Sequence, residues 1–473
     1  MEYFLAIDLG TTGTKTLLFD NLGNVIGKGY KGYGLITPVE NVYEQSPIDW
    51  YDAVIDSIKL ATVDFNGEVA GVSVSAQGGS FVFCDIDDKG NLIPLTNAIT
   101  WLDKRASVEA KELYDNVYKI TGAGLDGASA ISKVYWVKKH QPEIFNKTKI
   151  VFSTSDYIYY RLTGKSVIDP TSAAMMDFFD NDNLCWNADL LSLIGLSENK
   201  LPAVLGAGEF IGKANESFIN DTGLKGSVNV YVGVHDQFAA SLGNNYFESN
   251  TDLIISTGTT WVVFLRNPDK TTGPFYIRKH PNGGYAYFLS AISSGTVLEW
   301  TKNNYGTPYK EMDEFAKNSP IDKNLMVYPF VSGNGAYRGA NKLTYSIDGA
   351  TFKHTKGDLF RATMEGVAFE IKEIVNSFID KGFEIGNVIV TGGATRSDIW
   401  MSILSDVLNK KLYLSEQVDG CCFGAYSVAK KGYYGNFEKF EFSGKTVEPN
   451  LENAEIYNEK FIKYNKILNN KGE

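Results

Sequence analysis

Residues 6–20, AIDLGTTGTKTLLFD, predict two short apolar strands joined by a turn of glycine and threonine. The strands span Phe4–Asp8 and Lys15–Asp20, and Asp8 stands where the first strand ends. Glycine lets a ligand approach the main chain closely, and successive backbone N–H groups in such a turn attract phosphate oxygens. A carboxylate beside the turn can hold Mg²⁺ through waters. The stretch therefore predicts a phosphate-binding hairpin, with an ordinary polar hairpin as the alternative.

A second stretch of the same design lies well over two hundred residues downstream. Residues 253–267, LIISTGTTWVVFLRN, again place a small glycine–threonine turn between two apolar strands. Two such hairpins so far apart suggest a duplicated architecture with one phosphate cradle in each half. We therefore expect a nucleotide to lie between the halves.

Length, charge and cysteine usage narrow the class of protein. The 473 residues are too many for one core and fit two domains. The 45 basic and 56 acidic residues give a net charge of −11, and no Lys/Arg-rich run occurs, so nucleic acid and anionic membrane are not expected partners. Four cysteines without a CxxC pair fit a reducing cytosol, and Cys421 and Cys422 are expected to be small buried residues before a helix. No signal peptide or membrane-spanning run is found, so we expect a cytoplasmic protein.

Two stretches of the first half are candidates for binding a small substrate. The predicted strand Val69–Ser75 leads into Gln77-Gly78-Gly79, where backbone or substrate can come close. Residues 98–105, AITWLDKR, place Trp101 and Asp103 where an aromatic face and a carboxylate would meet a sugar. The alternative for the second stretch is a half-buried tryptophan beside a surface ion pair.

A carboxylate follows a third buried strand. The apolar run Asn229–Val234 ends in His235-Asp236-Gln237, and a helical run then begins at Phe238. A carboxylate at the carboxyl end of a buried strand is where α/β folds place reactive groups. Asp236 as a mere helix N-cap is the alternative, and His235 by itself indicates only a structural imidazole.

The second half holds one further glycine-rich turn. A predicted strand at Asn387–Thr391 is followed by Gly392-Gly393-Ala394 and then by a helix over Ser397–Leu408. Glycines between a buried strand and a helix suit the close approach of a base and ribose. A tight turn without a ligand is the alternative.

Three further helices are predicted in this half. Residues Asp358–Lys381 carry an apolar stripe at helical spacing. A helix over Phe423–Lys430 contains Gly424 and Ala425, which suit either close packing or a wall beside adenine. The polar composition near the C-terminus predicts that Glu452–Leu468 is a surface helix.

These parts together favour phosphoryl transfer. No G-x-S-x-G elbow and no identifiable Cys–His pair supports acyl transfer. Phosphoryl transfer needs positioned phosphates, Mg²⁺ and a carboxylate that accepts the proton of the attacking hydroxyl. An aspartate with an ordinary pKa of about 3.9 is ionised at neutral pH, so Asp236 can serve as that base.

The order of these motifs resembles the FGGY carbohydrate kinases, within the actin, sugar-kinase and heat-shock ATPase superfamily. The resemblance covers roughly Phe4 to Gly432. It rests on AIDLGTTGTK, AITWLDKRA, SKVYWVKKHQPEIF, VGVHDQFAASLG, ISTGTTW and VTGGATRSDIWMSILSDVLNKKLYL. It implies an α/β fold with two ribonuclease-H-like (actin-like ATPase) domains and an interdomain cleft, with residues 1–243 binding mainly sugar and residues 244–473 mainly ATP.

The resemblance also implies roles for individual residues. Asp236 would be the general base, and Asp8 and Asp236 the carboxylates near Mg²⁺, with Asp8 acting through water. The implied sugar contacts are Gln77, Gly78, Gly79, Trp101, Asp103, Asp236 and Gln237. The implied ATP and phosphate contacts are Thr11, Thr12, Gly13, Lys15, Gly258, Thr259, Gly392, Gly393, Ala394 and Ser397.

The expected substrate follows from positions at which this chain differs from particular kinases of the family. Xylulose kinases usually carry Met-His after the residue aligned with Gln77, and glycerol kinases carry Arg-Glu in that region, whereas this chain has Gly78-Gly79. Rhamnulose and fuculose kinases share the glycine at position 78 and the pair His235-Asp236. We therefore expect an ATP-dependent kinase for a deoxyketohexose such as L-fuculose, with D-xylulose or another ketopentose as the alternative. A non-catalytic actin-like ATP-binding scaffold is the alternative of a different class, and the sequence leaves a homodimer open.

Overall fold

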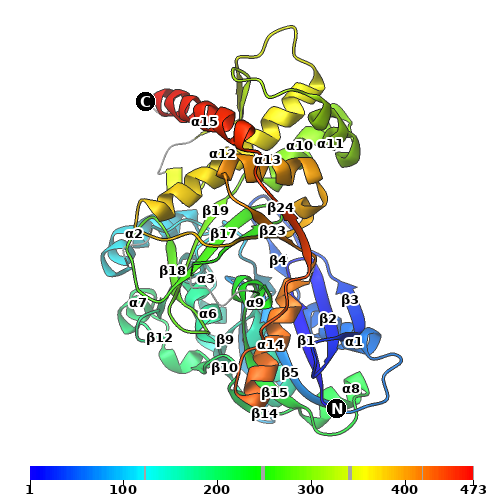
Figure 1. The fold of residues 1–473 in the computed structure, drawn as a ribbon. Coiled ribbons are helices and arrows are strands. Elements are labelled where there is room, and N and C mark those ends of the chain that lie inside the picture. The colour runs from blue at the N-terminus through cyan, green and yellow to red at the C-terminus, as the bar shows by residue number, and fades with distance from the viewer. Residues whose placement is uncertain (122–123, 245, 247–250, 339–342, 418, 472–473) are drawn as a thin grey trace. The chain divides into compact units, whose positions relative to one another are not determined.

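The computed structural model describes residues 1–121, 124–244, 246, 251–338, 343–417 and 419–471. These residues divide into two compact units, each with a mixed sheet against which helices pack (Figure 1). Unit 1 comprises Met1–Asn245, Lys279–Asn282 and Asp419–Lys439, and unit 2 comprises Tyr246–Arg278, Gly283–Val418 and Phe440–Glu473. The α/β class with two sheet-rich units is therefore confirmed.

The main sheet of unit 1 is built on the predicted first hairpin. In spatial order its strands are β14 (Phe210–Lys213), β15 (Asn229–His235), β5 (Val69–Ala76), β1 (Tyr3–Leu9), β2 (Gly13–Asp20) and β3 (Val25–Gly32). The pair β1–β2 is antiparallel, whereas β5 runs parallel to both β1 and β15. The carboxyl ends of β1, β5 and β15 therefore meet at one edge of the sheet, where α/β folds position ligands.

A smaller sheet and a set of helices complete unit 1. The smaller sheet contains β4 (Glu44–Gln45), β8 (Ala98–Ile99), β6 (Phe81–Ile86), β7 (Leu92–Pro94) and β9 (Ile150–Ser153). The helices are α1 (Pro47–Ala61), α2 (Ser107–Thr121), α3 (Ala130–His140), α4 (Pro142–Lys147), α5 (Thr154–Thr163), α6 (Pro170–Ala173), α7 (Ala188–Ile194), α8 (Glu216–Thr222), α9 (Asp236–Gly243) and α14 (Gly420–Tyr434). Helix α1 begins as its sequence dictates, because the hydroxyl of Ser46 accepts from the backbone N–H of Asp49.

Unit 2 repeats the arrangement of strands. Its main sheet holds β18 (Tyr276–Lys279), β19 (Tyr285–Ala291), β17 (Trp261–Asn267), β16 (Leu253–Thr257), β22 (Val388–Gly392), β23 (Leu412–Ser415) and β24 (Gly444–Val447). Its helices are α10 (Gly295–Tyr305), α11 (Tyr309–Asn318), α12 (Lys356–Ile379), α13 (Asp398–Leu408) and α15 (Leu451–Lys471). The pair β16–β17 is antiparallel, like β1–β2 in unit 1. Strand β16 runs parallel to β22, as β1 runs parallel to β5. The two glycine–threonine hairpins therefore occupy equivalent places in their sheets.

Helix α14 belongs to unit 1, although its sequence lies late in the chain. It packs against α9 and against β1, β5 and β15, and its orange ribbon stands beside these elements in Figure 1. A side chain at Gly424 would clash with the backbone of Ala239, so this glycine serves close helix packing. The helix starts at Gly420, earlier than the predicted Phe423. Because this helix belongs to unit 1, the compact units differ from a single division of the chain at residue 243.

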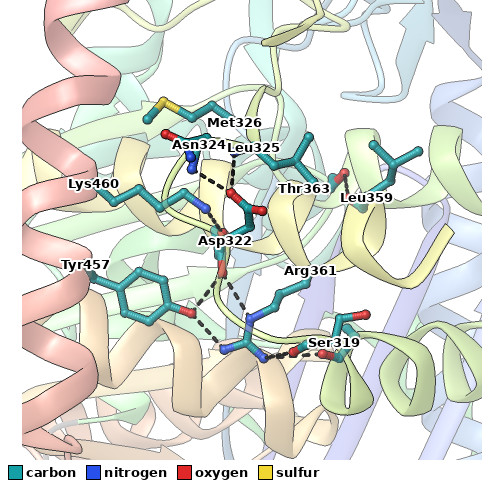
Figure 2. Close-up of polar contacts among 12 residues, drawn as sticks. Ser319, Asp322, Asn324, Leu325, Met326, Leu359, Arg361, Thr363, Tyr457 and Lys460 are labelled. Atoms are coloured by element: carbon teal, nitrogen blue, oxygen red, sulfur yellow. Dashed lines mark hydrogen bonds and ion pairs between the residues drawn. The ribbon is translucent and has the colours of Figure 1, made fainter. Parts of the chain in front are cut away.

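The predicted helix near the C-terminus is confirmed over Leu451–Lys471, and although many of its residues are exposed, one face of it is buried. In α15, Tyr457 and Lys460 are buried against α12. Figure 2 shows both side chains directed toward the region of Arg361, and the phenol of Tyr457 accepts from Arg361 Nη2 at 2.9 Å. The carboxylate of Glu365 accepts from Arg361, Tyr457 and Lys460 at 3.0, 2.9 and 2.5 Å. The polar sequence of α15 thus conceals a buried charged face whose groups are paired with α12.

No helix among the described residues is long and apolar enough to cross a membrane.

Candidate active site

The predicted reactive residues of unit 1 lie at one edge of its main sheet. The strand register places Leu9, Ala76 and His235 in one row across β1, β5 and β15. Asp8, Gln77 and Asp236 lie within one position of that row, each near the carboxyl end of its strand. Parallel pairing of these strands therefore gathers residues that are far apart in the sequence.

Hydrogen bonds link the first glycine–threonine turn to the predicted sugar side. Gln45 Nε2 donates to the carbonyl of Thr11 at 2.6 Å, and Gln77 Nε2 donates to Gln45 Oε1 at 2.9 Å. Trp101 Nε1 donates to the hydroxyl of Thr11 at 3.1 Å. Thr11 thus connects the turn with two of the residues assigned to sugar. Thr12, which follows it, is exposed.

Gly13, which ends this turn, has no room for a side chain. A Cβ there would lie 2.6 Å from the carbonyl oxygen of Lys31 and 2.7 Å from the hydroxyl of Tyr30. The glycine is therefore required by the approach of β3 to the hairpin. A direct phosphate contact for Gly13 stays a prediction.

Asp8 and Asp236 form an acidic pair. Partial burial and the negative charge of Asp236 raise the pKa of Asp8 to about 7, against the opposing charge of Lys15. Ser75 Oγ donates to Asp8 Oδ1 at 3.3 Å, and Asp236 Oδ1 is buried without a hydrogen bond from any described residue. A cation would satisfy both carboxylates, so the pair fits a metal ion.

The pair fits Mg²⁺ in particular. Among the described residues, no group of three or more His, Cys, Asp or Glu side chains could hold a metal by itself. Mg²⁺ keeps several waters and is usually held by one or two carboxylates together with substrate phosphates. A pair of carboxylates beside a predicted phosphate cradle matches that ligand set.

Asp236 is the first residue of α9, and its surroundings argue against the simple capping role. His235 occupies the N-cap position, and in the described part of the chain no side-chain cap hydrogen bond is formed there. The carboxylate of Asp236 is about one third exposed and lies 3.2 Å from Nε2 of the buried His235. The amide oxygen of Gln237, a predicted sugar contact, is likewise buried and accepts no hydrogen bond from a described residue.

His235 fills the space beside Gly78. A Cβ on Gly78 would lie 2.5 Å from Cδ2 and 2.6 Å from Nε2 of His235, and 2.7 Å from Cγ of Met175. The backbone N–H of His235 donates to the hydroxyl of Thr171 at 2.8 Å, which fixes the end of β15. Glycine at position 78 is therefore required by the imidazole that contacts Asp236.

We predict that Gly78→Ala lowers kcat/KM for the sugar by about 10- to 100-fold, because the imidazole must move and Asp236 loses its neighbour. Steady-state kinetics with the accepted sugar measure the effect. Gly34→Ala is the matched control, since a Cβ there meets nothing within 4 Å. Activity within twofold of wild type for Gly78→Ala would contradict this prediction, because it would show that His235 and Met175 can move away from the new methyl group without affecting catalysis.

The segment around Trp101 is held by buried charges. Asp103 is fully buried and accepts from the backbone N–H of Tyr43 at 2.8 Å and from Arg105 Nη2 at 2.8 Å. The predicted alternative of a surface ion pair is therefore wrong, because Arg105 is also largely buried. Direct sugar binding by Asp103 stays a prediction, whereas Trp101, at 46% exposure, is open to a ligand.

Lys133 of α3 connects the two loops that are predicted to bind the substrate. Its ammonium is fully buried and donates to the carbonyl of Thr100 at 2.8 Å and to that of Gly79 at 3.3 Å. Burial lowers the pKa of Lys133 to about 8. The sequence does not indicate this role, because a lysine on an amphipathic helix is ordinarily solvent-exposed.

The first turn of α14 contributes residues that were not predicted. Asp419 Oδ1 lies 2.5 Å from Nζ of Lys15. Partial burial by itself would lower the pKa of Lys15, but the contact with Asp419 outweighs it and the pKa is raised. The thiol of Cys421 donates to the carbonyl of Asp236 at 3.4 Å, and Cys422 Sγ lies 3.9 Å from the carbonyl oxygen of Lys15. Cys422 is buried and Cys421 is half-buried, as small packing residues would be. Only the tertiary fold brings this turn to the site, so no local sequence signal identifies it.

Unit 2 presents a second cradle. The register pairs Thr257 with Gly392, so the turn that contains Gly258 and Thr259 lies next to the turn Gly392–Ala394. The backbone N–H of Ala394 donates to the hydroxyl of Thr257 at 3.2 Å. Gly392 adopts φ +102° and packs against the carbonyl of Thr257, which requires glycine.

The accessibility of the second cradle suits a ligand. Gly258, Thr259 and Gly393 are exposed. Ser397, by contrast, uses its hydroxyl to donate to Asp313 Oδ1 at 2.8 Å and to cap α13 at the N–H of Trp400. The predicted contacts of these residues with ATP stay predictions.

Comparison with known proteins shows matches over nearly the whole chain. Residues 3–243 match the N-terminal domain of the FGGY family of carbohydrate kinases, and residues 253–432 match the C-terminal domain. The xylulose kinase of Bacillus subtilis is 26% identical, over 99% of this chain and 97% of that protein. The gluconokinase of Bacillus licheniformis is also 26% identical, over 90% of this chain and 86% of that protein. A ligand-bound xylulose kinase structure from Lactobacillus acidophilus has a TM-score of 0.91 at 23% identity, covering 99% of this chain and 98% of that one.

Proposed function

Because the chain belongs to the FGGY family of carbohydrate kinases, we propose that it transfers the γ-phosphate of ATP to a terminal hydroxyl of a ketopentose, with D-xylulose as the first candidate. The observation that supports this most directly is the pair Asp8 and Asp236 beside the glycine–threonine turn. One carboxylate can act as the base and both can face a metal ion, at the same edge of the sheet as the residues predicted to contact the sugar.

The relatives favour the ketopentose over the deoxyketohexose that the sequence suggested. The relatives described above include xylulose kinases, which supports the alternative named from the sequence rather than L-fuculose, whereas the name of the gluconokinase supports neither sugar. The glycine at position 78 is accounted for by packing against His235 and therefore carries no information on a 6-deoxy group. The ketopentose is accordingly the proposed substrate class.

In the proposed mechanism, Asp236 accepts the proton of the sugar hydroxyl that attacks phosphorus. Its carboxylate is about one third exposed although Oδ1 is buried beside His235, so the exposed part of the carboxylate is available to that hydroxyl. Lys15 contacts the transferred phosphate and offsets its negative charge. Trp101, Gln77 and Gln237 orient the sugar.

The ATP contacts proposed for unit 2 are its two turns. The exposed backbone at Gly258 and Thr259 would bind phosphates, and Gly393 with its neighbours would border the adenosine. Mg²⁺ near Asp8 and Asp236 would reduce the repulsion between the triphosphate and these carboxylates. An ADP-linked reaction that depends on Mg²⁺ is therefore expected.

An ADP-release assay over a panel of sugars tests the proposal. The panel contains D-xylulose, L-xylulose, D-ribulose, L-ribulose, L-fuculose and L-rhamnulose, with gluconate, glycerol and D-xylose as controls. We expect kcat/KM for one ketopentose to exceed that for every other compound by at least tenfold. A preference for L-fuculose would overturn the substrate class but not the kinase, whereas ATP binding without turnover on any compound would favour a non-catalytic scaffold.

A further inference from the structure

Asp419 stands at the N-cap of α14 but does not cap the helix. An aspartate at this position ordinarily accepts from a backbone N–H in the first turn, which stabilises a helix by about 1 kcal/mol. Among the described contacts, the Asp419 side chain makes no such hydrogen bond. Its Oδ1 lies instead 2.5 Å from Nζ of Lys15. Instead of capping its own helix, the carboxylate pairs with a residue more than four hundred positions away in the sequence.

The partner of Asp419 is the lysine that the proposed mechanism assigns to the phosphate. Lys15 lies on β2, directly across the hairpin from Asp8. Its side chain is 38% exposed and is therefore accessible to a ligand, whereas that of Asp419 is only 15% exposed. A lysine has a long flexible side chain and three donors, so one contact with Asp419 restricts its position and leaves two donors for phosphate oxygens.

The turn that carries Asp419 contacts the backbone of both the proposed base and the lysine. Cys421 contacts the backbone of Asp236, and Cys422 contacts the backbone of Lys15. The close packing of Gly424 on α9 holds the helix against the element that begins with Asp236. Asp419 is therefore presented by a helix that contacts both the proposed base and the lysine.

We propose that Asp419 is a positioning residue for phosphoryl transfer, which holds the Lys15 ammonium beside the glycine–threonine turn where the transferred phosphate binds. This inference rests on the proposed function. It differs from an ordinary exposed ion pair, which contributes little, because one partner is a group that contacts the reacting phosphate. Lys28 lies 3.9 Å from the other oxygen of Asp419 but is 67% exposed, and it has no part in this role.

The decisive variant is Asp419→Asn. Asparagine caps helices as well as aspartate does, so this change removes the charge without removing a capping group. We expect kcat to fall about 10- to 100-fold, with KM for the sugar within twofold of wild type and Tm within a few degrees. Asp419→Glu, which restores the charge, is expected to recover part of the loss.

A double-variant cycle separates positioning from structure. Lys15→Met combined with Asp419→Asn is expected to be no slower than Lys15→Met alone, because the carboxylate acts only through the lysine. Lys28→Met is the control and should retain wild-type kcat. Wild-type kcat in Asp419→Asn, additive losses in the double variant, or a loss that follows a large fall in Tm would each overturn the inference.

These outcomes are separate from a failure of the proposed function. If the unaltered chain phosphorylates no sugar on the panel, the proposed function fails and this inference fails with it. If the unaltered chain turns over and Asp419→Asn turns over equally well, the positioning role alone is overturned.

Discussion

Asp236→Asn is expected to lower kcat by about 10²- to 10⁴-fold while ATP affinity stays within a few-fold of wild type. The range is the usual contribution of a positioned general base. Asparagine keeps the size of the side chain but cannot accept the hydroxyl proton, and the turns proposed for the adenosine and the remaining phosphates lie in unit 2. Turnover is measured as ADP release with the sugar that the panel identifies, and ATP affinity by calorimetry.

A matched control is available for this variant. Asp115→Asn changes an exposed carboxylate on α2 by the same chemistry and should leave kcat unchanged. Turnover of Asp236→Asn within a few-fold of wild type would remove Asp236 from the role of base. A parallel loss of ATP binding would instead point to damage that extends beyond proton transfer.

Glu365→Gln is expected to lower the free energy of unfolding of unit 2 by about 3–5 kcal/mol. The carboxylate of Glu365 is buried and is the acceptor for Arg361, Tyr457 and Lys460. Its neutralisation leaves two buried cations without their counter-charge, which is the costly way to break a buried ion pair. Urea unfolding gives the magnitude, and amide hydrogen exchange in α12 and α15 shows where protection is lost.

The control for this second variant lies on α15, the helix that the Glu365 cluster joins to α12. Glu459→Gln removes the ion pair with Lys323, whose atoms are 2.8 Å apart but whose side chains are 69% and 56% exposed. Solvent screening limits such pairs to about 1 kcal/mol or less. Similar losses for both variants, or a change below about 1 kcal/mol for Glu365→Gln, would contradict the view that the buried cluster fastens α15 to α12.

The hairpins and strand ends could be predicted because their signals are local. Glycine and threonine between apolar runs place the turns of β1–β2 and β16–β17, and the apolar run before His235 places Asp236 at a strand end. The amphipathic stripe of α12 is also local, and the observed bounds, Lys356–Ile379, differ from the prediction by two residues at each end. Each of these features depends on neighbours within a few residues.

The errors fall where burial depends on distant partners. The polar residues of α15 predict a surface helix, and many of them are exposed, but they do not show that Lys460 is buried because Glu365 of α12 supplies its counter-charge. Asp103 looks like a surface charge until Arg105 and the backbone of Tyr43 enclose it. A sequence window shows that a residue is charged but not whether a partner accompanies it into the interior.

For this protein, the sequence by itself determined the two glycine–threonine hairpins, the α/β class and the carboxylates at the strand ends. Only the tertiary structure decided that α14 belongs to unit 1 and places Asp419 beside Lys15, that His235 requires glycine at position 78, and that Lys133 connects the loops of Gly79 and Thr100. Turns and strand ends follow from backbone preferences that act over a few residues. Pairing of side chains across distant elements follows from packing, which no local pattern encodes.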